Sequence, residues 1–436
     1  MLEKLRLKYE ENRLWIYPMK YIIVACILSA ITIMVDTRYV FVHKYVPTIF
    51  LTSIDLAQTI LGALVSSLLS ITTFTFSTTM VVLTMYSSDF SPRVIENFLS
   101  EKITMKVLGM FMGGFFYSIT SLLFMRQTLS TDFVISASIG VVYAILCLIY
   151  FAMFINTVSK SVQANNLITK LHEEADETIQ NAREFHKDSR LLENYELGDY
   201  IFRKYIKSEQ SGYLELVSYQ NIFSELRDKD YTLVIYPNNG DFIVRNQVIA
   251  SLYSKTEEFD DEIIENMNSH FTMQSGRSIT YDYLFAIEKL VDVTLRAAST
   301  GVNDPNTVIE CINILGMLMS DLSEIDGNFS ELTEEGSDSR IIYRYFDFDH
   351  DLFETFYQVV LYIKEDLGII LALYKALENI MINATENNKK HVANFIEYLD
   401  DKTTHYYDNE IDLQLLKDAK ERALHYNDRI LEINKI

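Results

Sequence analysis

Residues 56–88 read LAQTILGALVSSLLSITTFTFSTTMVVLTMYSS, a run of 33 positions without a charged side chain. At about 1.5 Å per residue, a helix of this length would reach roughly 50 Å, more than the roughly 30 Å of a bilayer's hydrocarbon core. We therefore expect a membrane-spanning helix that tilts, breaks or protrudes from the bilayer.

The polar side chains of this helix fall on one side of it. At about 100° per residue, eight positions lie within an arc of roughly 60°. This hydroxyl stripe consists of Asp55, Thr59, Ser66, Ser70, Thr73, Ser77, Thr84 and Ser88. The opposite side is apolar and carries Ile60, Leu64, Leu68, Ile71 and Val82. Because lipid cannot satisfy hydroxyl groups, the stripe must face protein or water. It either lines a water-filled path or packs against other helices.

Hydropathy predicts four spans, near residues 17–35, 55–88, 107–125 and 133–158. The predicted fold class is an α-helical membrane protein: a transmembrane domain over residues 1–160 is followed by a cytoplasmic α+β region. Within that region we expect a connecting helix at 161–199, a small β-rich insert at 200–254 and a helical part at 255–436.

Charge is distributed unevenly between these parts. Residues 1–160 contain 12 Lys and Arg and 9 Asp and Glu, a net charge of +3. The remaining residues contain 26 Lys and Arg and 51 Asp and Glu, a net charge of −25. Phosphate binding needs clustered Lys and Arg, so the acidic half argues against a nucleic-acid partner. The expected partners are the lipid bilayer, further copies of the chain and, for a conducting protein, ions.

Basic residues gather on one side of the predicted membrane domain. Five lie before or at the start of the first span: Lys4, Arg6, Lys8, Arg13 and Lys20. Arg93, Lys102, Lys106, Lys160 and Lys170 fall on the same side, against only Arg38, Lys44 and Arg126 on the other. The positive-inside rule then predicts a multi-pass protein with both termini in the cytoplasm.

Gly109 and Gly113 lie four residues apart in the third span. Small residues at this spacing let helices approach closely. The spacing fits either dimerisation or tight packing within one subunit, and we favour the second.

The β-rich insert has one specific local signal. Residues 232–236 and 241–244 are rich in β-formers and flank Pro237-Asn238-Asn239-Gly240, which predicts a β-hairpin.

The segment Arg296-Ala-Ala-Ser-Thr-Gly-Val-Asn-Asp-Pro305 is predicted to join two helices. Gly301 can take a left-handed backbone angle, Asp304 can cap a helix, and Pro305 suits its first turn. A structural turn explains every residue. Alternatively, Asn303 and Asp304 face a subunit interface or bind an ion beside Arg296.

The alternating residues Asp347, Asp349 and Asp351 would share one face of a strand, where they could bind a divalent cation or form a solvated acidic edge. We favour the edge. There is no zinc, phosphate-loop or nucleophile motif, and Cys26, Cys147 and Cys311 have no paired spacing. We therefore expect no enzyme, cofactor, metal or disulfide.

The long second span ends in Ser88-Asp89-Phe90-Ser91-Pro92-Arg93. Ser91 and Pro92 can begin a new helix, with the flanking residues as interfacial anchors. Alternatively, Asp89, Phe90 and Arg93 of several subunits form a constriction.

Several of these segments together resemble a bacterial membrane family, domain of unknown function 2254. The resemblance rests on residues 73–83 (TFTFSTTMVVL), 90–93 (FSPR) and 299–305 (STGVNDP), with Ser211-Gly212-Tyr213 and residues 240–244 (GDFIV) in support. It implies a multi-pass protein of a bacterial inner membrane with a cytoplasmic domain, and it supplies no activity.

The leading functional hypothesis is a homo-oligomeric channel or channel-like transporter for ions, with the second span lining the path. Four spans are too few to enclose a wide pore, so this reading requires oligomers. The alternative is a non-transporting membrane sensor or scaffold whose cytoplasmic domain binds a protein or metabolite.

Overall fold

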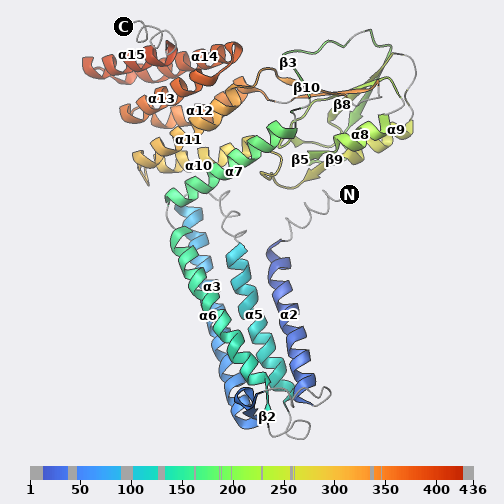
Figure 1. Ribbon diagram of the computed structural model, residues 1–436. Helices are drawn as coiled ribbons and strands as arrows, with labels where there is room; N and C mark the ends of the chain where they lie inside the picture. Colours follow the sequence, from blue (N-terminus) through green and yellow to red (C-terminus); the bar gives the residue numbers. More distant parts are fainter. Residues whose placement is uncertain are drawn as a thin grey trace. The chain divides into compact units, whose positions relative to one another are not determined.

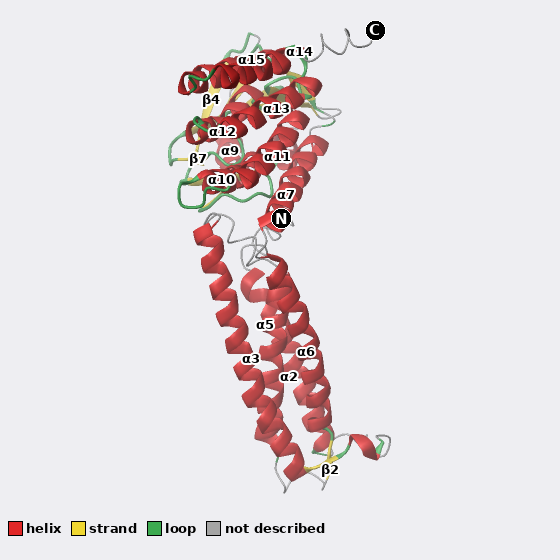
Figure 2. Ribbon diagram, turned by 90° about the vertical axis from the view of Figure 1, so that its left-hand side faces the viewer, coloured by secondary structure: helices red, strands yellow, loops and turns green. Residues whose placement is uncertain are grey.

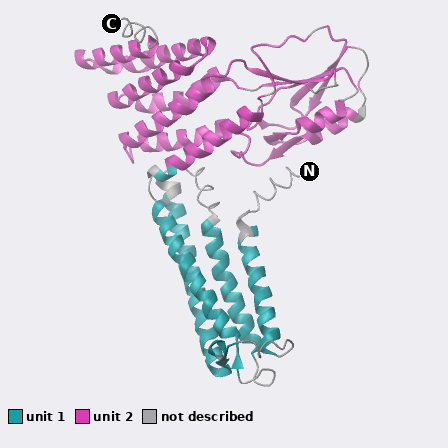
Figure 3. Ribbon diagram, in the orientation of Figure 1, with its two compact units in different colours: residues 1–167 teal, residues 168–436 magenta. Residues whose placement is uncertain are grey.

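The computed structural model describes residues 13–37, 47–89, 102–125, 133–161 and 164–425, with short gaps at 186, 188, 198, 227–228, 256–258, 260, 334–337 and 345. The chain divides into two compact units, Met1–Leu167 and Ile168–Ile436, which Figure 3 shows in two colours. Each unit has its own core and is described separately.

Unit 1 is a bundle of helices long and apolar enough to cross a membrane (Figure 1). The described helices are α2 (Arg13–Asp36), α3 (Ile54–Asp89), α5 (Lys102–Phe124) and α6 (Ser136–Ser161). Their candidate spans are Pro18–Asp36, Ile54–Met85, Ile103–Phe124 and Ser136–Lys160. The prediction of four spans is confirmed, with ends that differ by a few residues.

Helix α5 is the central helix of unit 1. It contacts α2, α3 and α6, and half of its apolar span is buried, against 17% for α3. Its buried side chains include Val107, Phe111 and Tyr117. The other three helices expose most of their apolar surface, as expected of helices that face lipid on one side.

The close approach of α2 to α5 depends on glycine. A Cβ added to Gly109 would lie 2.9 Å from the Pro18 Cα, and one added to Gly113 would lie 3.1 Å from the Tyr21 carbonyl oxygen. A Cβ at Gly113 would also meet the Tyr143 hydroxyl of α6 at 2.6 Å. The glycine pair is therefore used for packing within one subunit, the reading that the sequence favoured.

Some polar groups inside unit 1 form hydrogen bonds between helices. The Ser29 Oγ of α2 lies 2.6 Å from the Thr120 Oγ1 of α5. At the end of α2, the buried Asp36 carboxylate accepts hydrogen bonds from the backbone N–H groups of Ile135 and Ser136. Asp36 thus supplies the first turn of α6 with an acceptor from another helix. Beside it, β1 (Thr52–Ser53) pairs with β2 (Phe133–Val134).

Unit 2 begins with α7 (Ala164–Phe185), whose buried side follows Ile168, Leu171, Ala175 and Ile179. The predicted connecting helix was too long, because residues 190–192 already form a strand. The strands of unit 2 are β3 (Arg190–Leu192), β4 (Phe202–Lys207), β5 (Gly212–Val217), β6 (Tyr231–Ile235), β7 (Phe242–Ile243), β8 (Val248–Ser254), β9 (Phe271–Gln274), β10 (Phe329–Thr333) and β11 (Arg340–Arg344).

These strands form two sheets. The larger has the order β3-β10-β11-β6-β8-β4, and the smaller β7-β5-β9. Every described pairing is antiparallel except β6 with β11, which is parallel. The two sheets share a core with α8 (Tyr219–Leu226) and the region of α9 (Asp261–Met267), including Ile222, Leu233, Leu252, Met267 and Phe271.

Two features of this β region differ from the prediction. Strands β3, β9, β10 and β11 come from outside the predicted insert 200–254. The predicted hairpin is wrong, since β6 pairs with β8 and β11 whereas β7 pairs with β5 of the other sheet. The turn crosses between sheets, and Gly240 takes a φ of +90° there and donates its N–H to the Leu214 carbonyl.

The remaining helices of unit 2 stack in layers (Figure 1). They are α10 (Tyr283–Ala298), α11 (Pro305–Ser323), α12 (Phe348–Ile363), α13 (Leu367–Asn383), α14 (Glu386–Thr403) and α15 (Glu410–Leu424). Figure 1 shows α10 to α15 as one helical part beside the strands, and in Figure 2, turned by 90°, these helices lie in front of the strands. Each helix begins at a side chain that caps it, in chain order Asp282, Asp304, Asp347, Asp366, Thr385 and Asn409.

The substitution Gly113→Ala should destabilise unit 1. Its Cβ collides with backbone and with Tyr143, and such overpacking costs about 1–3 kcal/mol. The matched control is Gly62→Ala on α3, where a new Cβ meets nothing within 4 Å. Alanine is the better helix former by up to about 1 kcal/mol, so the control should be neutral or stabilising. Thermal unfolding of the purified protein in detergent measures both. Equal effects of the two substitutions would contradict the packing argument.

Candidate functional site

The hydroxyl stripe lies on the outer surface of unit 1. Its seven members with described side chains, Asp55 to Thr84, are all exposed in the single chain. The predicted apolar side faces the bundle, where Leu68 and Val82 are buried and Ile60, Leu64 and Ile71 are half-buried. Packing within one subunit therefore does not use the stripe.

Apolar side chains flank the stripe on both sides. At about 100° per residue, Leu69, Phe76 and Met80 fall on one side of it, and Leu56, Phe74 and Val81 on the other. All six are exposed in the single chain. The outward face of α3 thus has a polar centre between two apolar borders. Such a face suits a helix whose borders pack on neighbouring helices while its centre meets water.

Most hydroxyl groups of the stripe are satisfied within α3. Thr59 donates to the Asp55 carbonyl, Ser66 to Gly62, Ser70 to Ser66, Thr73 to Leu69 and Thr84 to Met80, at 2.9–3.2 Å. A hydroxyl that bonds to the carbonyl four residues earlier still has lone pairs that accept hydrogen bonds. The stripe can therefore accept hydrogen bonds from water along about 40 Å of helix without breaking its own bonds.

The predicted constriction falls largely outside the described part of the chain. Helix α3 ends at Asp89, but the side chains of Ser88 and Asp89 are not described, and Phe90 and Arg93 lie outside the described residues. The constriction stays a prediction.

The turn between α10 and α11 follows the sequence closely except at its left-handed residue. Asn303 takes a φ of +50°, whereas Gly301 does not lie in the left-handed region. Asparagine tolerates this conformation because its short side chain bonds locally. The Asn303 N–H donates to the Ser299 carbonyl, and the Asp304 N–H donates to the Ala297 carbonyl. The left-handed residue of the turn is thus Asn303, two residues after Gly301, and the prediction of a left-handed Gly301 was wrong.

Asp304 caps α11 as predicted, with Pro305 as the first helical residue. Its carboxylate accepts the Thr307 hydroxyl at 2.7 Å and the Thr307 N–H at 3.3 Å. These donors lower the pKa of Asp304 from its usual value. Arg296 is exposed on the last turn of α10. An interface or ion-binding role for these residues stays a prediction.

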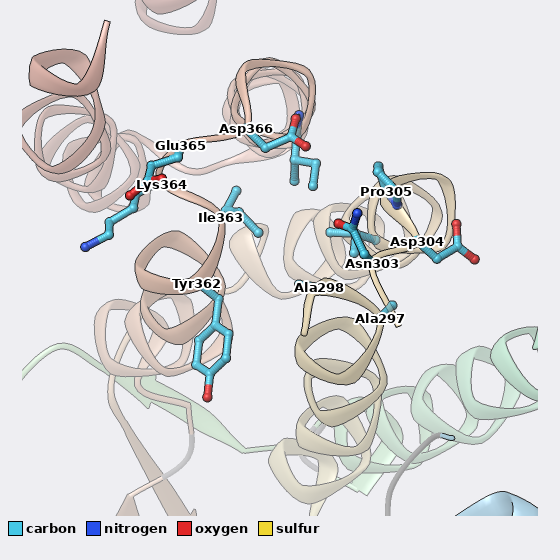
Figure 4. A pocket seen from close by; sticks show the side chains of 12 residues that line it. Ala297, Ala298, Asn303, Asp304, Pro305, Tyr362, Ile363, Lys364, Glu365 and Asp366 are labelled. Atoms are coloured by element: carbon cyan, nitrogen blue, oxygen red, sulfur yellow. The ribbon is translucent and has the colours of Figure 1, made fainter. Parts of the chain in front are cut away.

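The same turn borders a cavity of about 310 Å³. Its walls come from the end of α10, the turn and start of α11, and the α12–α13 connection. Figure 4 shows Asn303 and Asp366 at its edge with Tyr362 below, whereas the ends of Asp304 and Lys364 point away from the middle. Ala297, Val308, Ile363 and Ile369 give the cavity an apolar floor. The sequence indicated the turn but not the partner segment, which lies about 60 residues further along the chain.

The acidic segment Asp347 to Asp351 begins a helix rather than a strand. Asp347 caps α12, Asp349 is exposed and pairs with His391 at 2.9 Å, and Asp351 is buried. The three carboxylates have separate environments and do not converge. Among the described residues there is no group of three or more His, Cys, Asp and Glu side chains that could hold a metal ion.

The helices of unit 1 define the class of protein, a multi-pass membrane protein. More particularly, the chain belongs to the family described as predicted membrane protein (DUF2254), whose model matches residues 11–379. This confirms the family resemblance.

The curated relatives are uncharacterised proteins of Mycobacterium tuberculosis and Mycobacterium bovis. They are 23% identical over 272 residues, which cover 57% of this chain and 49% of the relative. The chain thus spans about half the length of the curated relatives it matches. No solved structure matches the chain.

The turn makes a simple prediction about stability. Asp304→Ala should lower the free energy of unfolding by about 0.5–2 kcal/mol, because α11 loses its cap. Since the pKa of Asp304 is lowered in the folded state, its contribution is present above its usual pKa and disappears as the pH falls.

Asn303→Gly is the matched control at the neighbouring position. Glycine adopts the left-handed angle without strain, so this substitution should leave the free energy of unfolding nearly unchanged. Urea unfolding at pH 7 measures both variants. A larger loss for Asn303→Gly than for Asp304→Ala would assign the Asn303 side chain a greater role than the cap.

Proposed function

We propose that the chain is a subunit of a homo-oligomeric channel or channel-like transporter for ions, with α3 lining the path. In this proposal it resides in a bacterial inner membrane with both termini and unit 2 in the cytoplasm, as the distribution of Lys and Arg favours. The observation that carries the proposal is the outward direction of the hydroxyl stripe. A polar stripe that its own subunit leaves uncovered has to be accommodated by a neighbour, by water or by lipid.

The position of α3 makes an assembly necessary for conduction. The centre of the described bundle is occupied by α5, whose Phe111 and Tyr117 are fully buried. A path lined by the stripe therefore lies outside one subunit and needs other subunits around it. The exposed borders, with Phe74 and Phe76 among them, supply apolar area for those contacts.

The alternative to water around the stripe is lipid. Hydroxyl groups that bond to their own helix are less costly in hydrocarbon than free ones, so single exposed Ser or Thr residues carry little information. The stripe, however, also contains the exposed carboxylate Asp55 and extends through the whole described span. Seven polar side chains in one row, bordered by apolar ones, favour water over lipid.

The decisive experiment compares two Ser→Leu substitutions on α3. Both side chains are exposed, but Ser70 lies in the hydroxyl stripe whereas Ser67 lies outside the arc of the stripe. In proteoliposomes that contain assembled protein, Ser70→Leu should reduce ion flux to the level of empty liposomes, because leucine dewets a narrow path. Ser67→Leu should retain the flux, and both variants should retain the wild-type subunit count.

Three results would overturn the proposal. One is a monomeric wild-type protein in mild detergent and in membranes. Another is wild-type flux in an assembled Ser70→Leu variant. The third is an assembled wild-type protein without flux under varied voltage, pH and membrane tension, which would leave the non-transporting sensor or scaffold as the better assignment.

A further inference from the structure

Asp351 is a buried carboxylate without an ion pair. Only 3% of its surface is exposed, and its carboxylate accepts one hydrogen bond, from the Tyr283 hydroxyl at 2.6 Å. No described cation lies within ion-pair distance of it. A buried carboxylate normally needs a cation or several donors to remain ionised, so this environment favours the protonated acid.

The charged groups around Asp351 already have partners. On its own helix, the Asp347 carboxylate pairs at 2.7 Å with Arg344, which ends β11. On α10, Asp282 pairs at 2.8 Å with Arg277, which also binds Glu288.

Arg344 is the cation that favours an ionised Asp351, but it already pairs with Asp347. From α11, the neighbour is the uncharged Met319, whose sulfur contacts Thr355. From α14, His391 pairs with the exposed Asp349. The ammonium of Lys289, a buried cation of α10, lies 5.3 Å from the centre of the Phe285 ring. An ionised Asp351 would thus be repelled by two carboxylates, Asp347 and Asp282, and Arg344 would offset that repulsion only in part.

The Tyr283–Asp351 contact lies where both sheets connect to the helical part. Strand β9 of the smaller sheet leads into α10, which begins at Tyr283, and β11 of the larger sheet leads into α12. The Tyr283 ring also packs edge-on against Phe346 in the β11–α12 connection, with ring centres 4.8 Å apart. One contact therefore joins two of the connections between strands and helices, β9–α10 and β11–α12, and we call it the joint.

We propose that the joint is a pH-sensitive device that holds the two connections together when Asp351 is protonated and loosens them when it is ionised. The charge change occurs inside the fold, so it alters the strength of the joint rather than surface binding. The device stands independently of ion conduction, because it concerns unit 2 alone.

The titration range follows from burial. Loss of water raises the pKa of Asp351 to about 7; Asp347 and Asp282 act in the same direction, whereas the Tyr283 hydrogen bond and Arg344 oppose the shift. A raised carboxyl pKa means that the stabilisation is fully present below the ordinary pKa and is lost as the pH rises through about 7. If local opening restores the ordinary pKa, the opening equilibrium constant should increase about tenfold between pH 6 and pH 8.

Amide hydrogen exchange on the full-length protein in detergent tests this directly. After correction for the intrinsic exchange rate, amides in the first turns of α10 and α12 should open about tenfold more often at pH 8 than at pH 6. Asp351→Asn keeps the size and an acceptor for Tyr283 but cannot ionise, so it should remove this dependence. Glu354→Gln, a half-buried acid on the same helix, should retain it.

A second variant keeps the test decisive where Asp351→Asn does not fold. Among the described residues Tyr283 is the one hydrogen-bond donor to the carboxylate, so Tyr283→Phe should move the midpoint of the opening transition to higher pH. The inference is wrong if the wild-type protein opens equally at both pH values. It is also wrong if Asp351→Asn retains the tenfold change, or if Tyr283→Phe leaves the midpoint unmoved.

Discussion

Hydrocarbon offers no hydrogen bonds, and the arrangement of unit 1 follows from that constraint. Some inward hydroxyl groups are paired across helices, as with Ser29 and Thr120, others such as that of Thr79 bond to their own helix, and the Asp36 carboxylate serves the start of α6. Hydroxyl groups that point outward from α3 are bonded to their own backbone. Glycine lets α2 reach α5 closely enough for the cross-helix pairs to form. Among the described helices of unit 1, α3 is therefore the one that presents a continuous polar row outward.

Several acidic residues of unit 2 stabilise its own fold. Asp282, Asp304, Asp347 and Asp366 each begin a helix of the layered part. Two of these caps are held by arginine, Asp282 by Arg277 and Asp347 by Arg344. Part of the negative charge of unit 2 thus stabilises helix starts, where carboxylates interact favourably with the free N–H groups. Net charge alone is a poor guide to the partners of this unit.

What could be predicted from the sequence depended on the range of the interactions. The four spans, the inward side of α3 and the cap at Asp304 follow from patterns within a few turns of one helix, and the structure has all of them. The sheets could not be predicted, because β6 lies between strands from residues 248–254 and 340–344 and the adjacent β7 joins another sheet. The segment from Asp347 to Asp351 was expected to form a solvated acidic edge, because no local pattern reveals that Asp351 is buried and bonded to Tyr283. The cavity beside Asn303 was missed for the same reason.

The parallel pairing of β6 with β11 has a consequence for biosynthesis. Thr232 and its partner Arg340 are 108 residues apart in the chain. During translation, the fully buried strand β6 therefore waits with one edge unpaired until α10, α11 and β10 have been made. An unpaired apolar edge of this kind invites wrong partners. We therefore expect that the free edge of β6 needs protection, either by a chaperone or by rapid synthesis of β11, before the larger sheet can form.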